Sequence, residues 1–168
     1  MKNIVLVGFS GVGKTTVGRL LSSKLKMEFF DTDDAIRRCE KMPLPELLKK
    51  KGAKYFEGAQ RFAVSTLAQN ENCIISTGGD TVTDTFNADA LHKTGILVWL
   101  TAQPETVYQN TRRSAGRRPG LAKATPEDIA RMMEERKPFY EKADIAVSVD
   151  RGDLEAVTDE IIEKCKAL

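Results

Sequence analysis

Short apolar runs alternate with longer amphipathic segments along the chain. The short runs contain three to six residues and are typical of buried strands; they are residues 3–8, 28–30, 73–76, 96–100 and 145–149. The longer segments repeat apolar residues every three or four positions, which predicts helices at 14–26, 33–40, 44–51, 54–69, 104–114, 126–140 and 153–166. Strands that alternate with helices predict an α/β fold with a parallel sheet covered on both faces.

A glycine-rich loop joins the first predicted strand to the first predicted helix. Gly8, Gly11 and Gly13 precede Lys14 and Thr15, which fits the phosphate-binding P-loop pattern. Glycines let backbone N–H groups turn toward phosphate oxygens, lysine adds a charge, and threonine offers a hydroxyl to Mg²⁺. The strand–loop–helix context disfavours the alternative, a turn with an incidental lysine. The residues expected to bind the nucleotide are Gly11, Val12, Gly13, Lys14, Thr15 and Thr16.

Composition narrows the class of protein. A chain of 168 residues predicts one domain, residues 1–168. The 26 basic and 24 acidic residues are too balanced to indicate a nucleic acid or an anionic membrane as partner. No apolar run approaches the ~20 residues that span a bilayer, and the first run passes directly into the loop, unlike a signal peptide. Three scattered cysteines indicate reduced thiols, so we expect a cytoplasmic protein.

An arginine-rich segment breaks the alternation of strands and helices. Residues 111–123 hold four arginines and one lysine among small residues. A basic run is often only a solvated surface. Beside a phosphate site, however, a mobile basic lid is a recurrent way to neutralise a transferring phosphoryl group. We therefore predict a lid at about 112–124.

The acids after the second strand separate this chain from other P-loop proteins. It lacks the Asn-Lys-x-Asp motif of GTPases, and no acid directly follows strands 73–76 or 96–100, as one does in motor and transporter ATPases. Asp31 and Asp33 instead follow the second strand, at the sheet edge where ligands gather. One carboxylate could hold Mg²⁺ through water while the other accepts a proton from a hydroxyl. The alternative is a helix N-cap made by Asp33 or Thr32.

Four further motifs accompany the phosphate loop. They are Phe30-Asp31-Thr32-Asp33, Ser76-Thr77-Gly78-Gly79, Arg118-Pro119 before a leucine, and Arg136-x-Pro138-x-Tyr140. In order and spacing the chain resembles shikimate kinases over essentially its whole length. The resemblance implies a P-loop three-layer α/β/α fold of the nucleoside-monophosphate-kinase kind, with a five-stranded parallel sheet, a lid, and a substrate-binding helical segment at about 33–62. It also implies ATP with Mg²⁺ and phosphorylation of the 3-hydroxyl of shikimate, in aromatic amino-acid biosynthesis.

The resemblance also assigns roles on the nucleotide side. Lys14 and Thr15 would serve the phosphates and the metal, and Asp31 would support Mg²⁺. Arg118 would come from the lid as a catalytic residue. The arginine that contacts adenine would be Arg112 or its neighbour Arg113, of which we take Arg112.

On the substrate side, Asp33 would orient and deprotonate the hydroxyl. Gly78 and Gly79 would let the backbone approach the ring, and Arg136 would hold the carboxylate. The alternative for Arg136 is a surface helix residue paired with Glu135 or other nearby acids.

Three positions depart from the family pattern in the substrate pocket. Glu57 stands where the family has an arginine that grips the carboxylate, Asp80 replaces a third glycine, and Arg37 replaces an acid. One explanation is an exchange of charge in which Arg37 and Glu57 are neighbours. The other is a different substrate, without a carboxylate or with an amine. Arg37 and Glu57 therefore join the candidate substrate-binding residues.

Three functions remain open from the residues alone. The first is shikimate kinase, the second a kinase of another small polyol on the same fold, and the third a nucleotide-binding protein without turnover. All three predict a small-molecule ligand rather than a nucleic acid or a membrane, and we expect a monomer.

Overall fold

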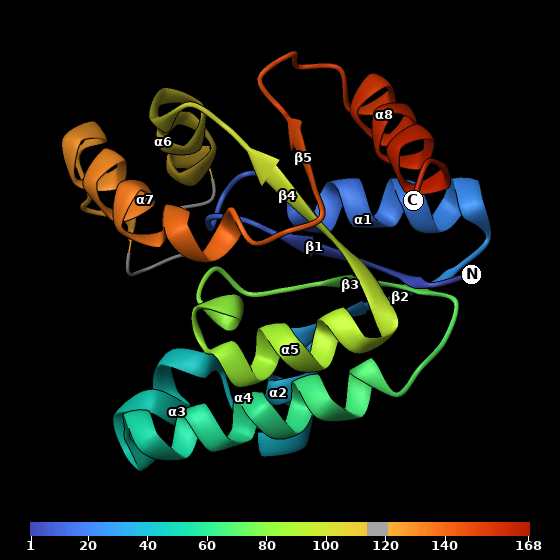
Figure 1. The fold of residues 1–168 in the computed structure, drawn as a ribbon. Helices are drawn as coiled ribbons and strands as arrows, with labels where there is room; N and C mark the ends of the chain where they lie inside the picture. Colours follow the sequence, from blue (N-terminus) through green and yellow to red (C-terminus); the bar gives the residue numbers. More distant parts are fainter. Residues whose placement is uncertain (114–120) are drawn as a thin grey trace.

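The structure is a computed structural model that describes residues 1–113 and 121–168. Its strands form one parallel sheet in the order β2-β3-β1-β4-β5 (Figure 1). The strands are β1 (Asn3–Val7), β2 (Glu28–Asp31), β3 (Cys73–Ser76), β4 (Gly95–Thr101) and β5 (Ile145–Ser148). Ile4 of the central strand pairs with Ile74 of β3 and Ile96 of β4, and every residue of β1 is buried. The predicted five-stranded parallel sheet is confirmed.

Helices cover both faces of this sheet (Figure 1). On one face lie α1 (Lys14–Leu25) and α8 (Leu154–Lys166), and on the other α4 (Ala53–Ala68) and α5 (Thr85–Thr94). Both α2 (Thr32–Glu40) and α3 (Leu44–Lys51) pack on α4. The remaining elements are α6 (Pro104–Arg113), α7 (Pro126–Tyr140), which packs on α6, and the short helix η1 (Thr81–Thr83).

Local chemistry explains where the helices begin. The carboxylate of Asp31 caps α2, so this helix starts at Thr32, one residue earlier than predicted. At α7, the Thr125 hydroxyl accepts a hydrogen bond from the Asp128 N–H, and the Thr125 N–H donates to the Asp128 carboxylate. The predicted start of this helix at residue 126 is confirmed.

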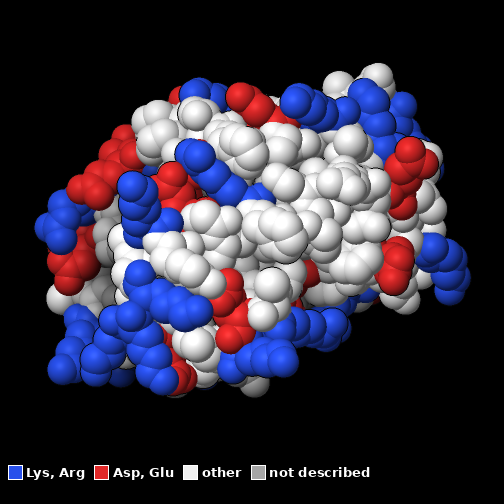
Figure 2. All heavy atoms as spheres, turned by 90° about the horizontal axis from the view of Figure 1, so that it is seen from below, with Lys and Arg blue, Asp and Glu red and all other residues white. Residues whose placement is uncertain are grey.

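The surface over α3 and α4 is uneven in charge. Figure 2 views it from below and shows Lys and Arg gathered at the end that holds α3, whose last turn carries Lys49, Lys50 and Lys51. Uncharged side chains fill the middle, and α4 exposes Tyr55 and Phe62. None of the described helices is both long and apolar enough to cross a membrane.

Two glycines provide a matched test of the packing. A Cβ at Gly18 of α1 would lie 2.5 Å from Cε2 of Phe29, whereas a Cβ at Gly58 of α4 meets nothing within 4 Å. Gly18→Ala should therefore lower the free energy of unfolding by about 1–3 kcal/mol through overpacking. Gly58→Ala should raise it by about 0.5–1 kcal/mol through helix propensity. Urea unfolding of both variants measures the difference, and equal effects would contradict the packing of α1 on β2.

Candidate active site

A cavity of about 820 Å³ lies where the parallel strands end. Its walls come from the phosphate loop after β1, the junction of β2 with α2, the loop after β3, and α7. These segments meet because the carboxyl ends of parallel strands share one edge of the sheet. The cavity brings together most of the predicted site residues, namely Gly11, Gly13, Lys14, Thr15, Thr16, Asp31, Asp33, Arg37, Gly78, Gly79 and Arg136.

The phosphate loop has the conformation that its glycines predict. Gly11 and Gly13 have φ of 93° and 99°, in the left-handed region, and α1 begins directly after them. The positive end of the α1 dipole therefore faces the cavity. Lys14 is buried, and its Nζ donates to the carbonyl oxygens of Gly8 at 2.6 Å and Phe9 at 3.0 Å. Val12, a predicted nucleotide contact, buries its side chain in the core.

Asp31 has two tasks at the start of α2. Its Oδ1 accepts hydrogen bonds from the N–H groups of Asp33 at 2.8 Å and Asp34 at 3.1 Å. The alternative that Asp33 or Thr32 caps the helix is therefore wrong, because Asp31 fills that role. Its Oδ2 lies 3.5 Å from the Thr15 hydroxyl.

The pair of Thr15 and Asp31 fits a magnesium ion. Mg²⁺ prefers oxygen ligands and takes few from protein, the rest being water and substrate phosphate. A hydroxyl and a carboxylate oxygen face each other here beside the phosphate loop. Among the described residues, no group of three or more His, Cys, Asp or Glu side chains could hold a metal by itself.

The Asp33 carboxyl is packed against the loop that follows β3. A Cβ at Gly78 would lie 2.6 Å from the Asp33 Oδ1, so a glycine is needed to leave room for the carboxyl. The Gly78 N–H donates to the Thr32 hydroxyl at 3.0 Å, which fixes this loop to the start of α2. Burial raises the pKa of the Asp33 carboxyl from its ordinary 3.8 to about 6. The carboxylates of Asp31 and Asp80 also raise this pKa, while Lys14 and Arg37 oppose the shift.

Arg136 reaches the opposite side of the same loop from α7. Its Nη1 donates to the Gly79 carbonyl at 3.3 Å, and its guanidinium lies 5.1 Å from the centre of the Phe9 ring. The Tyr140 hydroxyl donates to the same Gly79 carbonyl. Arg136 therefore lines the cavity, which favours the site role over the surface role.

Known proteins with similar sequences share this fold. The shikimate kinase family model matches residues 10–166. The chain belongs to the shikimate kinase family. Curated shikimate kinases from Caldanaerobacter subterraneus subsp. tengcongensis and Moorella thermoacetica are 39% and 38% identical; the alignments cover 96% and 98% of this chain and 95% of each relative. A solved shikimate kinase from Acinetobacter baumannii in complex with shikimate has a TM-score of 0.91 at 31% identity, covering 99% of this chain and 94% of that one. The resemblance inferred from the motifs is confirmed.

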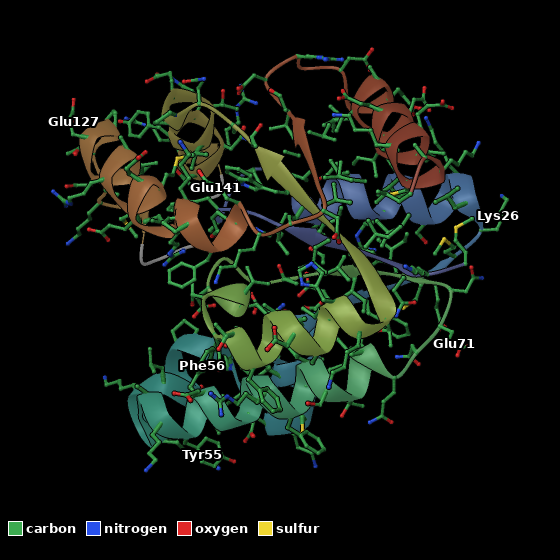
Figure 3. The ribbon with its side chains drawn as sticks, viewed as in Figure 1. Lys26, Tyr55, Phe56, Glu71, Glu127 and Glu141 are labelled. Atoms are coloured by element: carbon green, nitrogen blue, oxygen red, sulfur yellow. The ribbon has the colours of Figure 1, made fainter. Side chains whose placement is uncertain are left out.

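The positions that depart from the family pattern fall into two neighbouring pockets. Arg37 lines the phosphate-loop cavity and pairs with Asp34 of its own helix. Glu57 and Asp80 line an adjoining pocket of about 950 Å³ between α3, α4 and the loop at 80–85. Figure 3 places Phe56, which precedes Glu57, at the side of α4 that faces α3. Glu57 is thus outside the cavity in which sequence analysis placed it, and its ion pair is with Arg61 at 3.2 Å rather than with Arg37.

The end of α6 approaches the phosphate loop. The Asn110 side chain donates to the Gly11 carbonyl at 2.8 Å, a contact that sequence analysis missed because no motif marks it. Arg112, predicted to contact adenine, donates to the Tyr108 hydroxyl at 2.7 Å. Arg118 and residues 114–120 of the predicted lid lie outside the described residues.

Polar residues that hold the site in place were also missed. Thr32 is predicted only as an alternative cap of the helix, Tyr140 stands in a predicted motif without a role, and Gln60 lies outside the predicted motifs. The Gln60 amide is buried and lies 3.3 Å from the Asp80 carboxylate. Only the fold shows that these side chains bind the loop after β3.

The pKa of Asp33 predicts how stability depends on pH. The pKa of the Asp33 carboxyl is higher in the folded state than in the unfolded state. Below the unfolded-state pKa the carboxyl is protonated and does not destabilise the fold, but stability is lost as pH rises through about 6. Asp33→Asn cannot ionise, so its free energy of unfolding relative to wild type should increase by about 2 kcal/mol between pH 4 and pH 8. Urea unfolding across this range measures the trend.

Asp128 provides a control of opposite sign. Its pKa is lowered, first by the hydrogen bond from the Thr125 N–H, so its carboxylate stabilises the fold above the unfolded pKa. Asp128→Asn should therefore lose stability relative to wild type as pH rises. If the difference in free energy of unfolding between Asp33→Asn and wild type did not change with pH, the raised pKa of the Asp33 carboxyl would be contradicted.

Proposed function

We propose that this protein is an ATP-dependent kinase that phosphorylates the 3-hydroxyl of shikimate. The observation that carries the proposal is the placement of the Asp33 carboxyl, which is half-buried and does not cap a helix, in one cavity with a complete phosphate loop. Family membership supports the choice of shikimate, because the solved relative from Acinetobacter baumannii holds that molecule.

The reaction would be an in-line phosphoryl transfer. The substrate hydroxyl oxygen forms a bond to the γ-phosphorus of ATP, the bond between that phosphorus and the β–γ bridging oxygen breaks, and ADP leaves. Asp33 accepts the hydroxyl proton, which its pKa of about 6 allows because the carboxyl is mostly ionised near neutral pH. Lys14 and the N–H groups of the phosphate loop stabilise charge on the transferring group.

Other side chains would position the reactants. Thr15 and Asp31 would hold Mg²⁺, which screens the phosphate charge when bound. Gly78 and Gly79 leave room for the ring, and Arg136 binds the carboxylate. We also assign Arg118 to the transferring phosphoryl group and Arg112 to adenine. As a biosynthetic kinase with three free thiols, the protein would act in the cytoplasm, as a monomer.

A second substrate class has one observation in its favour. Glu57 and Asp80 place two acids in the pocket that adjoins the cavity through Leu44 and Pro45. These acids would suit a polyol that carries an amine. An amino-polyol kinase is therefore the second candidate.

Coupled ADP release separates the candidates. Wild-type protein with Mg²⁺–ATP is tested with shikimate, quinate, 3-dehydroshikimate, gluconate and amino-polyols. We expect saturable turnover with shikimate, and loss of nearly all turnover in Lys14→Ala because charge is removed from the transition state. Release of ADP only with an amino-polyol would overturn the choice of substrate. Nucleotide binding without release in any reaction would overturn the assignment as a kinase.

A further inference from the structure

The cavity presents two guanidinium groups on its acceptor side. Among the described residues that line it, the cations are Lys14, Arg37 and Arg136. Lys14 is fastened to the phosphate loop through Gly8 and Phe9, so its charge belongs to the nucleotide half. Arg37 and Arg136 come from different helices, α2 and α7, and remain for the second substrate.

Arg37 is positioned by the same helix that presents Asp33. The two residues are four apart on α2, so they lie on one face, one turn from each other. Both line the cavity together with Asp34. Arg37 pairs with Asp34 through Nη2 alone, and its other donors have no partner among the described residues. A guanidinium has five N–H donors, so a second carboxylate can still bind it.

The acids that line the cavity make a nearby cation important for binding a substrate carboxylate. Asp31, Asp33 and Asp34 all line the cavity, and a substrate carboxylate entering it would be repelled by them. Arg136 brings a positive charge to the same cavity from α7. Arg37 offsets the charge of Asp34, and it lies one helical turn from Asp33, the proposed proton acceptor.

Arg61 is a further arginine near the site, and it is already paired with other acids. Arg61 binds Asp84 through two hydrogen bonds of 2.7 and 3.1 Å and also pairs with Glu57. Its guanidinium lies 4.9 Å from the centre of the Phe86 ring. Arg61 therefore pairs with Asp84 and Glu57 of the adjoining pocket and does not line the phosphate-loop cavity.

We propose that Arg37 is a specificity-determining residue that binds the carboxylate of the acceptor together with Arg136. The proposal rests on the proposed function, phosphorylation of shikimate. It places the carboxylate between α2 and α7, with the pocket of Glu57 and Asp80 outside the carboxylate site. The donor missing at Glu57 is thereby supplied from α2, without a contact between Arg37 and Glu57.

The test compares an acceptor that has the carboxylate with one that lacks its charge. Steady-state kinetics and calorimetric binding are measured with shikimate and with its carboxamide, for wild type, Arg37→Gln and Arg37→Lys. Arg37→Gln should raise KM and Kd for shikimate by about tenfold to a hundredfold and change those for the carboxamide less than about twofold. KM for ATP should not change, and Arg37→Lys should recover part of the loss because the charge is kept.

One variant serves as a matched control. Arg38→Gln removes the same charge from the next residue of α2, which does not line the cavity, and should leave KM for shikimate within about twofold. Thermal unfolding checks that each variant is folded.

The outcomes distinguish this inference from the proposed function. Wild-type turnover of shikimate with an unchanged KM in Arg37→Gln would overturn the role of Arg37 and leave the function standing. Equal losses for shikimate and the carboxamide would also overturn it, since the carboxylate would not be the group recognised. If the wild-type protein neither binds nor turns over shikimate, both the role of Arg37 and the proposed function are overturned.

Discussion

Asp31 accepts two backbone hydrogen bonds at the start of α2 through one carboxylate oxygen and faces Thr15 with the other. This cap fixes the direction in which α2 leaves the sheet, and it satisfies the first free N–H groups of the helix, so the Asp33 carboxyl is not used as a cap. Asp33 is consequently held with its carboxyl against Gly78, and Arg37 follows one turn later. Because Asp31 caps the helix, the Asp33 carboxyl remains available for the substrate.

Four hydrogen bonds between side chains and backbone join the helices to the loops at the sheet edge. Gly78 donates to Thr32 at the start of α2, Gly79 accepts from two side chains of α7, and Gly11 accepts from Asn110 of α6. Each contact links a helix to a loop that contains glycine, where a side chain would fill the cavity or the space of a neighbour. The buried Gln60 amide donates to the exposed Asp80 carboxylate and extends this support on the substrate side. The cavity is therefore held by polar contacts, over a sheet held by apolar packing.

The sequence was sufficient for the sheet, and it named most of the residues that line the cavity. Short apolar runs have few alternatives to buried strands, and a P-loop between a strand and a helix has a narrow geometry. The motifs also identified Asp31, Asp33 and Arg136. Sequence analysis could not assign the cap to Asp31, because Asp, Thr and Asp in succession are all good caps. The sequence also does not show that Glu57 and Arg37 line different pockets. Helical spacing predicts neighbours within α2, but it does not predict which pocket a residue of α4 lines.

The measurement that tests this account most directly is the turnover number of Asp33→Asn with shikimate, taken together with its affinity for ATP. We expect kcat to fall by about 10²–10⁴-fold, because the proton acceptor is lost. The affinity for ATP should stay within about twofold, because Asp31, Thr15 and Lys14 remain in place. A kcat close to that of wild type, or a parallel loss of ATP binding, would contradict the assignment of Asp33 as the proton acceptor.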